Sequence, residues 1–167
     1  GPTGFPFEKY FAKIFQDQGY KTEVDLHLLG TCVMHEIDIL LERDGKKEVV
    51  EAKFHNGFGI VTDVQVALYT YSRFLDIKDK NNLTGVWLIT NTKLSLDAIT
   101  YANCKNMKVL AWNYPSGASL QDFVEKPRMY PITILTDLTG QEKIRLIEDN
   151  IILCRDLLAL SEKELNS

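Results

Sequence analysis

The chain has 167 residues, of which 45% are hydrophobic and 25% charged, with a formal net charge of −4. The length fits one domain with at most a small appendage, and the composition is that of a globular protein with a sizeable core. The acidic total argues against a protein whose whole surface attracts nucleic acid, although a modest basic groove can coexist with it.

Hydrophobic periodicity divides the chain into alternating helical and extended segments. The expected order is helix, three strands, helix, strand, helix and strand, over residues 7–18, 21–29, 33–42, 47–54, 63–75, 85–90, 95–103 and 109–112. The expected buried side of the second helix comprises Val64, Ala67, Leu68, Tyr71, Phe74 and Leu75. This order predicts the α/β class, with a mixed central sheet flanked by helices.

The last part of the chain has a different pattern. Prolines and glycines punctuate it from Gly117 onward, and two short helices are expected over residues 140–149 and 153–160. We therefore divide the chain into a core over residues 1–125 and a C-terminal helical extension over residues 126–167. The extension could grip DNA, form a dimer surface or close the sheet.

The cysteines and the hydropathy pattern bear on the cellular compartment. Cys32, Cys104 and Cys154 lie far apart, and their odd number favours reduced thiols over a disulfide framework. We find neither a signal peptide nor an apolar run long enough to cross a bilayer. We therefore expect a cytoplasmic protein.

The second and third expected strands form a hairpin around the tight turn Asp44-Gly45. On its first arm, Glu36 and Asp38 are expected on one face, because side chains alternate along a strand. Ile37 and Ile39 are then expected together on the opposite face.

The second arm of the hairpin presents Glu51 and Lys53 with the same two-residue period. Burial of unpaired charge is costly, so such charges among apolar neighbours need mutual pairing or a metal ion. Mg²⁺ prefers one or two carboxylates together with water and phosphate oxygens. Asp38 and Glu51 are therefore expected to bind a divalent metal ion, with Lys53 holding the attacking water and Glu36 as an accessory candidate.

A glutamate and a lysine two residues apart on a strand usually mark a solvated strand edge. An aspartate by itself is equally uninformative about function. The combination across one hairpin is more specific. The pattern Asp38…Glu51-Ala52-Lys53 resembles the PD-(D/E)xK nuclease motif, most closely that of the Mrr-like restriction endonucleases, with Ile37 in place of the usual proline. The resemblance covers residues 4–115. It implies a restriction-endonuclease-like core in the order α-β-β-β-α-β-α-β.

Three further positions fit the resemblance, and the chemistry of histidine suggests a fourth candidate. Gln65 and Tyr69 match a QxxxY pattern that follows the catalytic lysine in several of these nucleases, where Gln65 would orient the substrate or Lys53. A solvated Gln65 and a half-buried Tyr69 would fit an ordinary helix as well. Glu8 matches an acid that completes the metal shell in some relatives, although the helix dipole also favours glutamate there. His55 could shuttle a proton or contact a phosphate, although loop histidines are more often incidental.

The resemblance implies an endonuclease that hydrolyses DNA phosphodiester bonds with Mg²⁺ or Mn²⁺, in bacterial restriction or DNA defence. DNA is the expected partner, and a homodimer would bring two active centres to the two strands. The opening Gly1-Pro2-Thr3-Gly4-Phe5 is similar to the junction where such domains follow an ATP-cone regulatory domain. The alternatives are a catalytically silent DNA-binding module and a protein-interaction module on the same fold.

Overall fold

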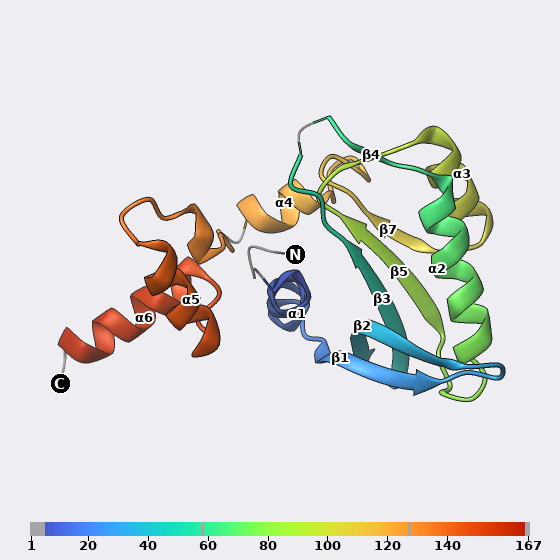
Figure 1. Cartoon of the computed structure of the whole chain (residues 1–167), viewed down its shortest axis with the longest axis horizontal. Coiled ribbons are helices and arrows are strands. Elements are labelled where there is room, and N and C mark those ends of the chain that lie inside the picture. Colours follow the sequence, from blue (N-terminus) through green and yellow to red (C-terminus); the bar gives the residue numbers. More distant parts are fainter. Residues whose placement is uncertain (1–5, 58, 127, 166–167) are drawn as a thin grey trace.

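A mixed five-stranded sheet with the strand order β1-β2-β3-β5-β7 forms the centre of the molecule (Figure 1). The computed structural model describes residues 6–57, 59–126 and 128–165, so the expected regulatory-domain junction at residues 1–5 lies outside the described residues. The elements are α1 (Phe7–Asp17), β1 (Lys21–Leu29), β2 (Met34–Arg43), β3 (Lys46–Lys53), β4 (Val61–Thr62), α2 (Val64–Ile77), β5 (Gly85–Thr90), β6 (Lys93–Leu94), α3 (Leu96–Cys104), β7 (Lys108–Leu110), α4 (Leu120–Glu125), the 3₁₀ helix η1 (Ile132–Ile134), α5 (Gly140–Glu148) and α6 (Cys154–Leu165).

The expected α/β architecture is confirmed. Strands β1, β2 and β3 form an antiparallel meander, and β5 and β7 then add in parallel. In Figure 1, α1 lies on one side of the sheet, and α2 and α3 lie on the other. Each side has its own buried cluster, one built on α1 and the other on α2 and α3. The β3–β5 and β5–β7 crossovers bury one face of the sheet with α2 and α3, and α1 covers the other face, so the parallel strands are buried on both sides.

Sequence periodicity misplaced part of the buried side of α2. Leu68 and Leu75 were expected in the core but are 42% and 44% exposed, whereas Thr70 is 2% and Ile77 0% exposed. Thr70 tolerates burial because its hydroxyl donates a hydrogen bond of 2.7 Å to the carbonyl oxygen of Val66. The buried side of α2 therefore includes Thr70 and Ile77 and excludes Leu68 and Leu75.

The small second sheet, formed by β4 and β6 in parallel, was not predicted. Each of these strands has two residues, which is too short for an alternating pattern to be recognised. Three threonine hydroxyls, those of Thr62, Thr90 and Thr92, form a buried hydrogen-bonded cluster where this sheet meets β5. The cluster ties the loop after β3 to the end of the central sheet.

The regular alternation of β2 fails at Asp38. Ile37 packs in the cluster on the α2 side, whereas Ile39 packs in the cluster on the α1 side, so the expectation that both share one face is wrong. The paired register of β1 and β2 passes from Val24–Ile39 to Leu26–Ile37 without a pair between them. Asp25, in that gap, has φ +51°. This left-handed residue distorts the strand pair and redirects the side chain of Asp38.

The C-terminal helices α5 and α6 agree with the predicted helices at residues 140–149 and 153–160. This region packs on α1, since Ile152 and Leu153 belong to the α1-side cluster and Arg155 pairs with Asp17 at 3.0 Å. Among the described residues, no helix combines the length and the apolar character that a membrane crossing requires. Cys32, Cys104 and Cys154 are all free thiols.

The distortion at Asp25 can be tested with two substitutions that both remove its carboxylate. We expect Asp25→Val to unfold with a free energy about 1–2 kcal/mol lower than Asp25→Gly, because only glycine adopts a left-handed backbone without steric cost. Urea unfolding measures the difference. The matched pair Glu23→Val and Glu23→Gly, on the same strand, should show the reverse order, and the same order at both positions would contradict the assignment.

Candidate functional site

Asp38 is held against the neighbouring strand by a backbone hydrogen bond. The β2–β3 pairing ends at Ile39–Val50, and beyond it the amide of Ala52 donates to Asp38 Oδ2 at 2.8 Å. Burial raises the pKa of Asp38 above its ordinary value, although the Ala52 hydrogen bond and the charges of Arg73 and Lys53 oppose the shift. Burial therefore leaves the ionised carboxylate less stable than it would be in water.

Glu51 lies between two cations. Its side chain is only 5% exposed, its Oε1 is 3.0 Å from Lys53 Nζ, and its Oε2 forms an ion pair with Arg73. Oε2 is buried and accepts no hydrogen bond of good geometry from the described residues. The two residues expected on β3 thus meet directly, and Asp38 binds the peptide amide between them.

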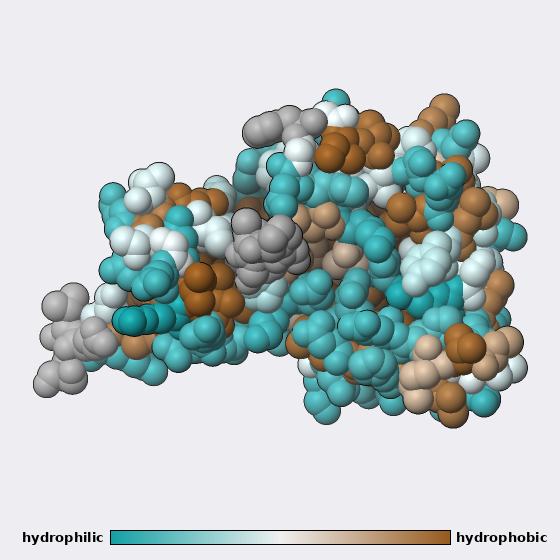
Figure 2. Space-filling view, viewed as in Figure 1, coloured by the Kyte–Doolittle hydropathy of each residue, from teal (hydrophilic) through white to brown (hydrophobic). Residues whose placement is uncertain are grey.

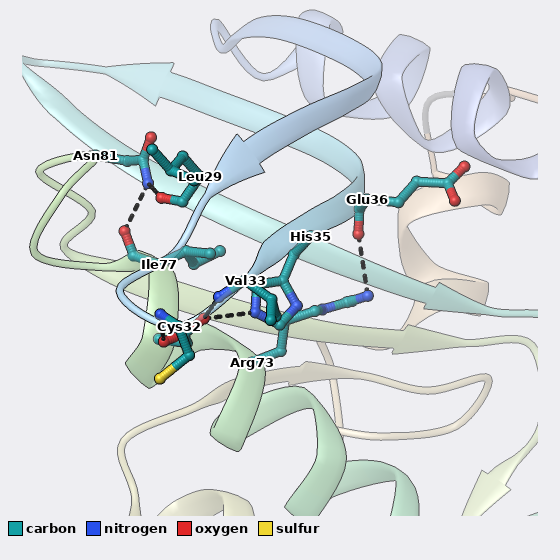
Figure 3. A network of polar contacts seen from close by, with 9 residues as sticks. Leu29, Cys32, Val33, His35, Glu36, Arg73, Ile77 and Asn81 are labelled. Atoms are coloured by element: carbon teal, nitrogen blue, oxygen red, sulfur yellow. Dashed lines mark hydrogen bonds and ion pairs between the residues drawn. The ribbon is translucent and has the colours of Figure 1, made fainter.

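Arg73 is the residue of this cluster that sequence reasoning missed. It projects from α2, its side chain is 12% exposed, and its Nη1 donates to the carbonyl oxygen of Glu36 at 3.1 Å (Figure 3). Its guanidinium lies 5.1 Å from the centre of the Tyr69 ring. Burial lowers the pKa of Arg73, against the opposing charge of Asp38. The sequence signal was available, because Gln65, Tyr69 and Arg73 follow one another at four-residue spacing on one helix face.

Glu8 lies near the same cluster, on α1. Burial is the main reason that its pKa is raised, and the charge of Asp38 contributes to the increase. Phe7 stacks on Phe54 with ring centroids 3.3 Å apart, which fixes the start of α1 against the residue that follows Lys53. The predicted accessory acid is therefore electrostatically coupled to Asp38.

The other accessory candidates are placed differently. The carbonyl of Glu36 faces Arg73, whereas its carboxylate points away from Arg73 in Figure 3. Gln65 is exposed in the first turn of α2, where its backbone amide donates a hydrogen bond to the side chain of the N-cap residue Asp63. The backbone of His55 is clamped by the side chain of Asn91 through hydrogen bonds of 2.9 and 2.8 Å. In all three residues these contacts involve the main chain.

The donor chemistry of the site fits a hard divalent cation. Asp38 and Glu51 supply carboxylate oxygens from adjacent strands, and Mg²⁺ needs only one or two such groups because water completes its shell. Within the described part of the chain, no three His, Cys, Asp or Glu side chains gather closely enough to hold a metal ion. Glu8 is therefore not a ready third ligand in this arrangement, and a two-carboxylate site is the one that the residues fit.

A second polar network fixes the turn between β1 and β2 against α2. Asp76 accepts hydrogen bonds from the amides of Cys32 and Val33 at 2.8 and 3.3 Å, and its Oδ2 lies 2.8 Å from His35 Nε2. A side chain at Gly30 would overlap the Asp76 carboxylate. These hydrogen bonds anchor the start of β2 to α2, the helix that carries Arg73 (Figure 3).

An open groove of about 610 Å³ lies between this turn and α2. It is lined by Thr31, Cys32, Val33, His35, Tyr69, Ser72, Arg73, Leu75 and Asp76. Brown and tan side chains gather at the β1–β2 turn in Figure 2, and the exposed ones are Leu29, Val33 and Met34. The groove therefore joins an apolar rim to the charged cluster around Arg73.

The fold and the charged strands define a restriction-endonuclease-like protein. The Mrr_cat family, described as restriction endonuclease, matches residues 3–118, and the C-terminal domain of AF1548-like proteins matches residues 130–167. The chain belongs to the Mrr-type restriction endonuclease family, as its Asp38…Glu51-Ala52-Lys53 pattern indicated.

Two proteins are similar to this chain over most of their own length. An uncharacterized protein of Archaeoglobus fulgidus is 36% identical over 154 residues, which cover 92% of this chain and 87% of that protein. The crystal structure of the protein of unknown function AF1548 is similar with a TM-score of 0.86 and 35% identity, over 96% of this chain and 86% of that one. A Vibrio cholerae structure has a TM-score of 0.44 and 16% identity, over 64% of this chain and 28% of that one, which is too low to support an inference.

The turn network makes stability depend on pH through Asp76. The hydrogen bond from His35, followed by those from the Cys32 and Val33 backbone, holds the pKa of Asp76 well below its usual range. A depressed folded-state pKa stabilises the protein above the unfolded pKa of about 3.9, and this contribution is lost as pH falls toward the folded pKa. We expect Asp76→Asn to lower the urea midpoint at pH 7, with the deficit shrinking below about pH 4.

Urea titrations at several pH values measure this deficit. The control is Asp79→Asn, an exposed carboxylate just beyond α2, which should change the midpoint little at any pH. A deficit of Asp76→Asn that stays constant down to pH 2 would contradict an electrostatic role for this carboxylate.

Proposed function

We propose that the protein is a metal-dependent endonuclease that hydrolyses phosphodiester bonds in DNA and acts in restriction or DNA defence. The proposal rests on one arrangement. Glu51 contacts Lys53 on β3, and Asp38 from β2 binds the amide of the residue between them. Membership of the restriction endonuclease family supports the same reading of these three side chains.

Each residue has a distinct proposed role. Asp38 and Glu51 hold Mg²⁺ or Mn²⁺, which when bound would activate water and offset charge at phosphorus. Lys53 has a side chain that is 40% exposed, so its ammonium can reach solvent and substrate while it contacts Glu51. It positions the attacking water and stabilises charge developing on the phosphate. Gln65, at the exposed start of the same helix as Arg73, orients the substrate.

A catalytically silent DNA-binding module is the second candidate. The cations of the site favour it, because Lys53 and Arg73 already neutralise Glu51 without a metal ion. Such a module would bind DNA in the absence of divalent cations and leave it intact. A protein-interaction module would bind neither DNA nor the cation.

Plasmid cleavage tests the proposal. We expect the wild-type chain to nick supercoiled plasmid with Mg²⁺ or Mn²⁺ and to be inactive with EDTA. Asp38→Asn should abolish cleavage, and Lys53→Ala should slow it by about 100- to 1,000-fold, as expected for the loss of one charge-stabilising group. Gel analysis of supercoiled, nicked and linear DNA measures the rates, and early linear product would indicate the paired active centres of a homodimer.

The matched control is Lys46→Ala. Lys46 is exposed at the opposite end of β3 from Lys53, so its loss removes the same charge without touching the site. Lys46→Ala should cut at the wild-type rate. Equal cutting by the wild type, Asp38→Asn and Lys53→Ala would reveal a contaminating nuclease and remove the proposal, whereas tight DNA binding with no cutting would establish the silent module.

A further inference from the structure

We propose that Arg73 is a displaceable counter-ion of Glu51, which occupies the carboxylate in the metal-free protein and leaves it when a divalent cation binds. The inference rests on the proposed function, because it concerns the cation that Asp38 and Glu51 would hold. It assigns to α2 a residue that governs how tightly this cation binds.

The first support is the occupancy of Glu51. Each of its two carboxylate oxygens faces one cation, Lys53 at Oε1 and Arg73 at Oε2. A metal ion that uses Glu51 as a ligand must therefore take an oxygen that already has a positive neighbour. The Lys53 side chain is 40% exposed and can turn toward solvent. The Arg73 side chain is only 12% exposed and pairs with the buried Oε2 of Glu51.

The second support is the burial of Glu51 Oε2. This oxygen is buried, and the Arg73 guanidinium is its ion-pair partner. A buried charge needs a partner of opposite charge. A hard divalent cation can therefore use this oxygen as a ligand only in place of the guanidinium.

The third support is that Arg73 has somewhere to go. Its side chain borders the groove of about 610 Å³ between α2 and the β1–β2 turn. The guanidinium lies over the Tyr69 ring, 5.1 Å from its centre, and donates to the carbonyl oxygen of Glu36 at 3.1 Å. Tyr69 also lines the groove, so the guanidinium can keep this partner while it withdraws from Glu51. Figure 3 shows the side chain extended from α2 toward β2.

These observations predict the direction of a binding change. Two cations that compete for one carboxylate are negatively coupled, and such couplings are typically about 5- to 150-fold. Removal of the guanidinium should therefore tighten metal binding by about tenfold. If Arg73 instead positioned Glu51 as a ligand, its removal would weaken binding, so the two roles predict opposite signs.

Manganese titration decides between them. We would titrate Mn²⁺ into wild type, Arg73→Gln and Arg73→Lys, and follow the free-ion signal by electron paramagnetic resonance, with Ca²⁺ calorimetry as a second readout without turnover. We expect the dissociation constant to fall for Arg73→Gln. Arg73→Lys, which keeps the charge on a shorter reach, should lie between the two and also serves if Arg73→Gln does not fold.

Arg43 offers a closely matched control. Its guanidinium lies 3.9 Å from the centre of the Tyr20 ring and donates to the carbonyl oxygen of Gln18 at 3.0 Å. Arg43→Gln thus removes the same kind of stacked, carbonyl-bound arginine away from the site. It should leave the dissociation constant for Mn²⁺ unchanged.

The results separate this inference from the proposed function. Binding by the wild type that disappears in Asp38→Asn, combined with unchanged or weaker binding by both Arg73 variants, would overturn the counter-ion role and leave the metal site intact. Binding that appears only in the Arg73 variants would support the competition most strongly. Absence of Mn²⁺ binding in all variants at millimolar concentration would overturn both.

Discussion

The buried carboxylate of Glu51 is the constraint on which the rest of the site depends. A charge that is 5% exposed cannot remain unpaired, because breaking a buried ion pair costs about 3–5 kcal/mol. The fold answers with Arg73 from α2 and Lys53 from the same strand. The position of α2 on the sheet therefore decides whether Arg73 neutralises the Glu51 carboxylate.

Asp38 contacts β3 through an irregularity in the sheet. A regular strand pair would engage the amide of Ala52 in the β2–β3 ladder, but the ladder stops at Ile39–Val50 and the amide donates to Asp38. The left-handed Asp25 lies in the matching gap on β1. Local irregularity of this kind is common next to active sites, because it re-aims a side chain that strict alternation would send elsewhere.

Polar contacts also fix the β1–β2 turn to α2 on one face of the sheet and the C-terminal region to α1 on the other. Asp76 fastens the turn to α2 through His35 and two backbone amides, which keeps β2 in register beside the guanidinium of Arg73. On the other face, Tyr10 donates to the carbonyl of Met129 at 3.0 Å, and Arg155 pairs with Asp17. The C-terminal region therefore packs on the helix that carries Glu8, whatever further role its exposed surface has.

Local sequence determined the order of the main helices and strands, the hairpin and the Asp38…Glu51-Ala52-Lys53 pattern, because periodicity, turn chemistry and motif spacing are properties of short segments. Only the tertiary structure decided which faces are buried and which charges meet. Ile37 and Ile39 separate because of a distortion that depends on the partner strand. Arg73 pairs with Glu51, which lies 22 positions earlier in the chain, because the packing of α2 on the sheet brings the two side chains together.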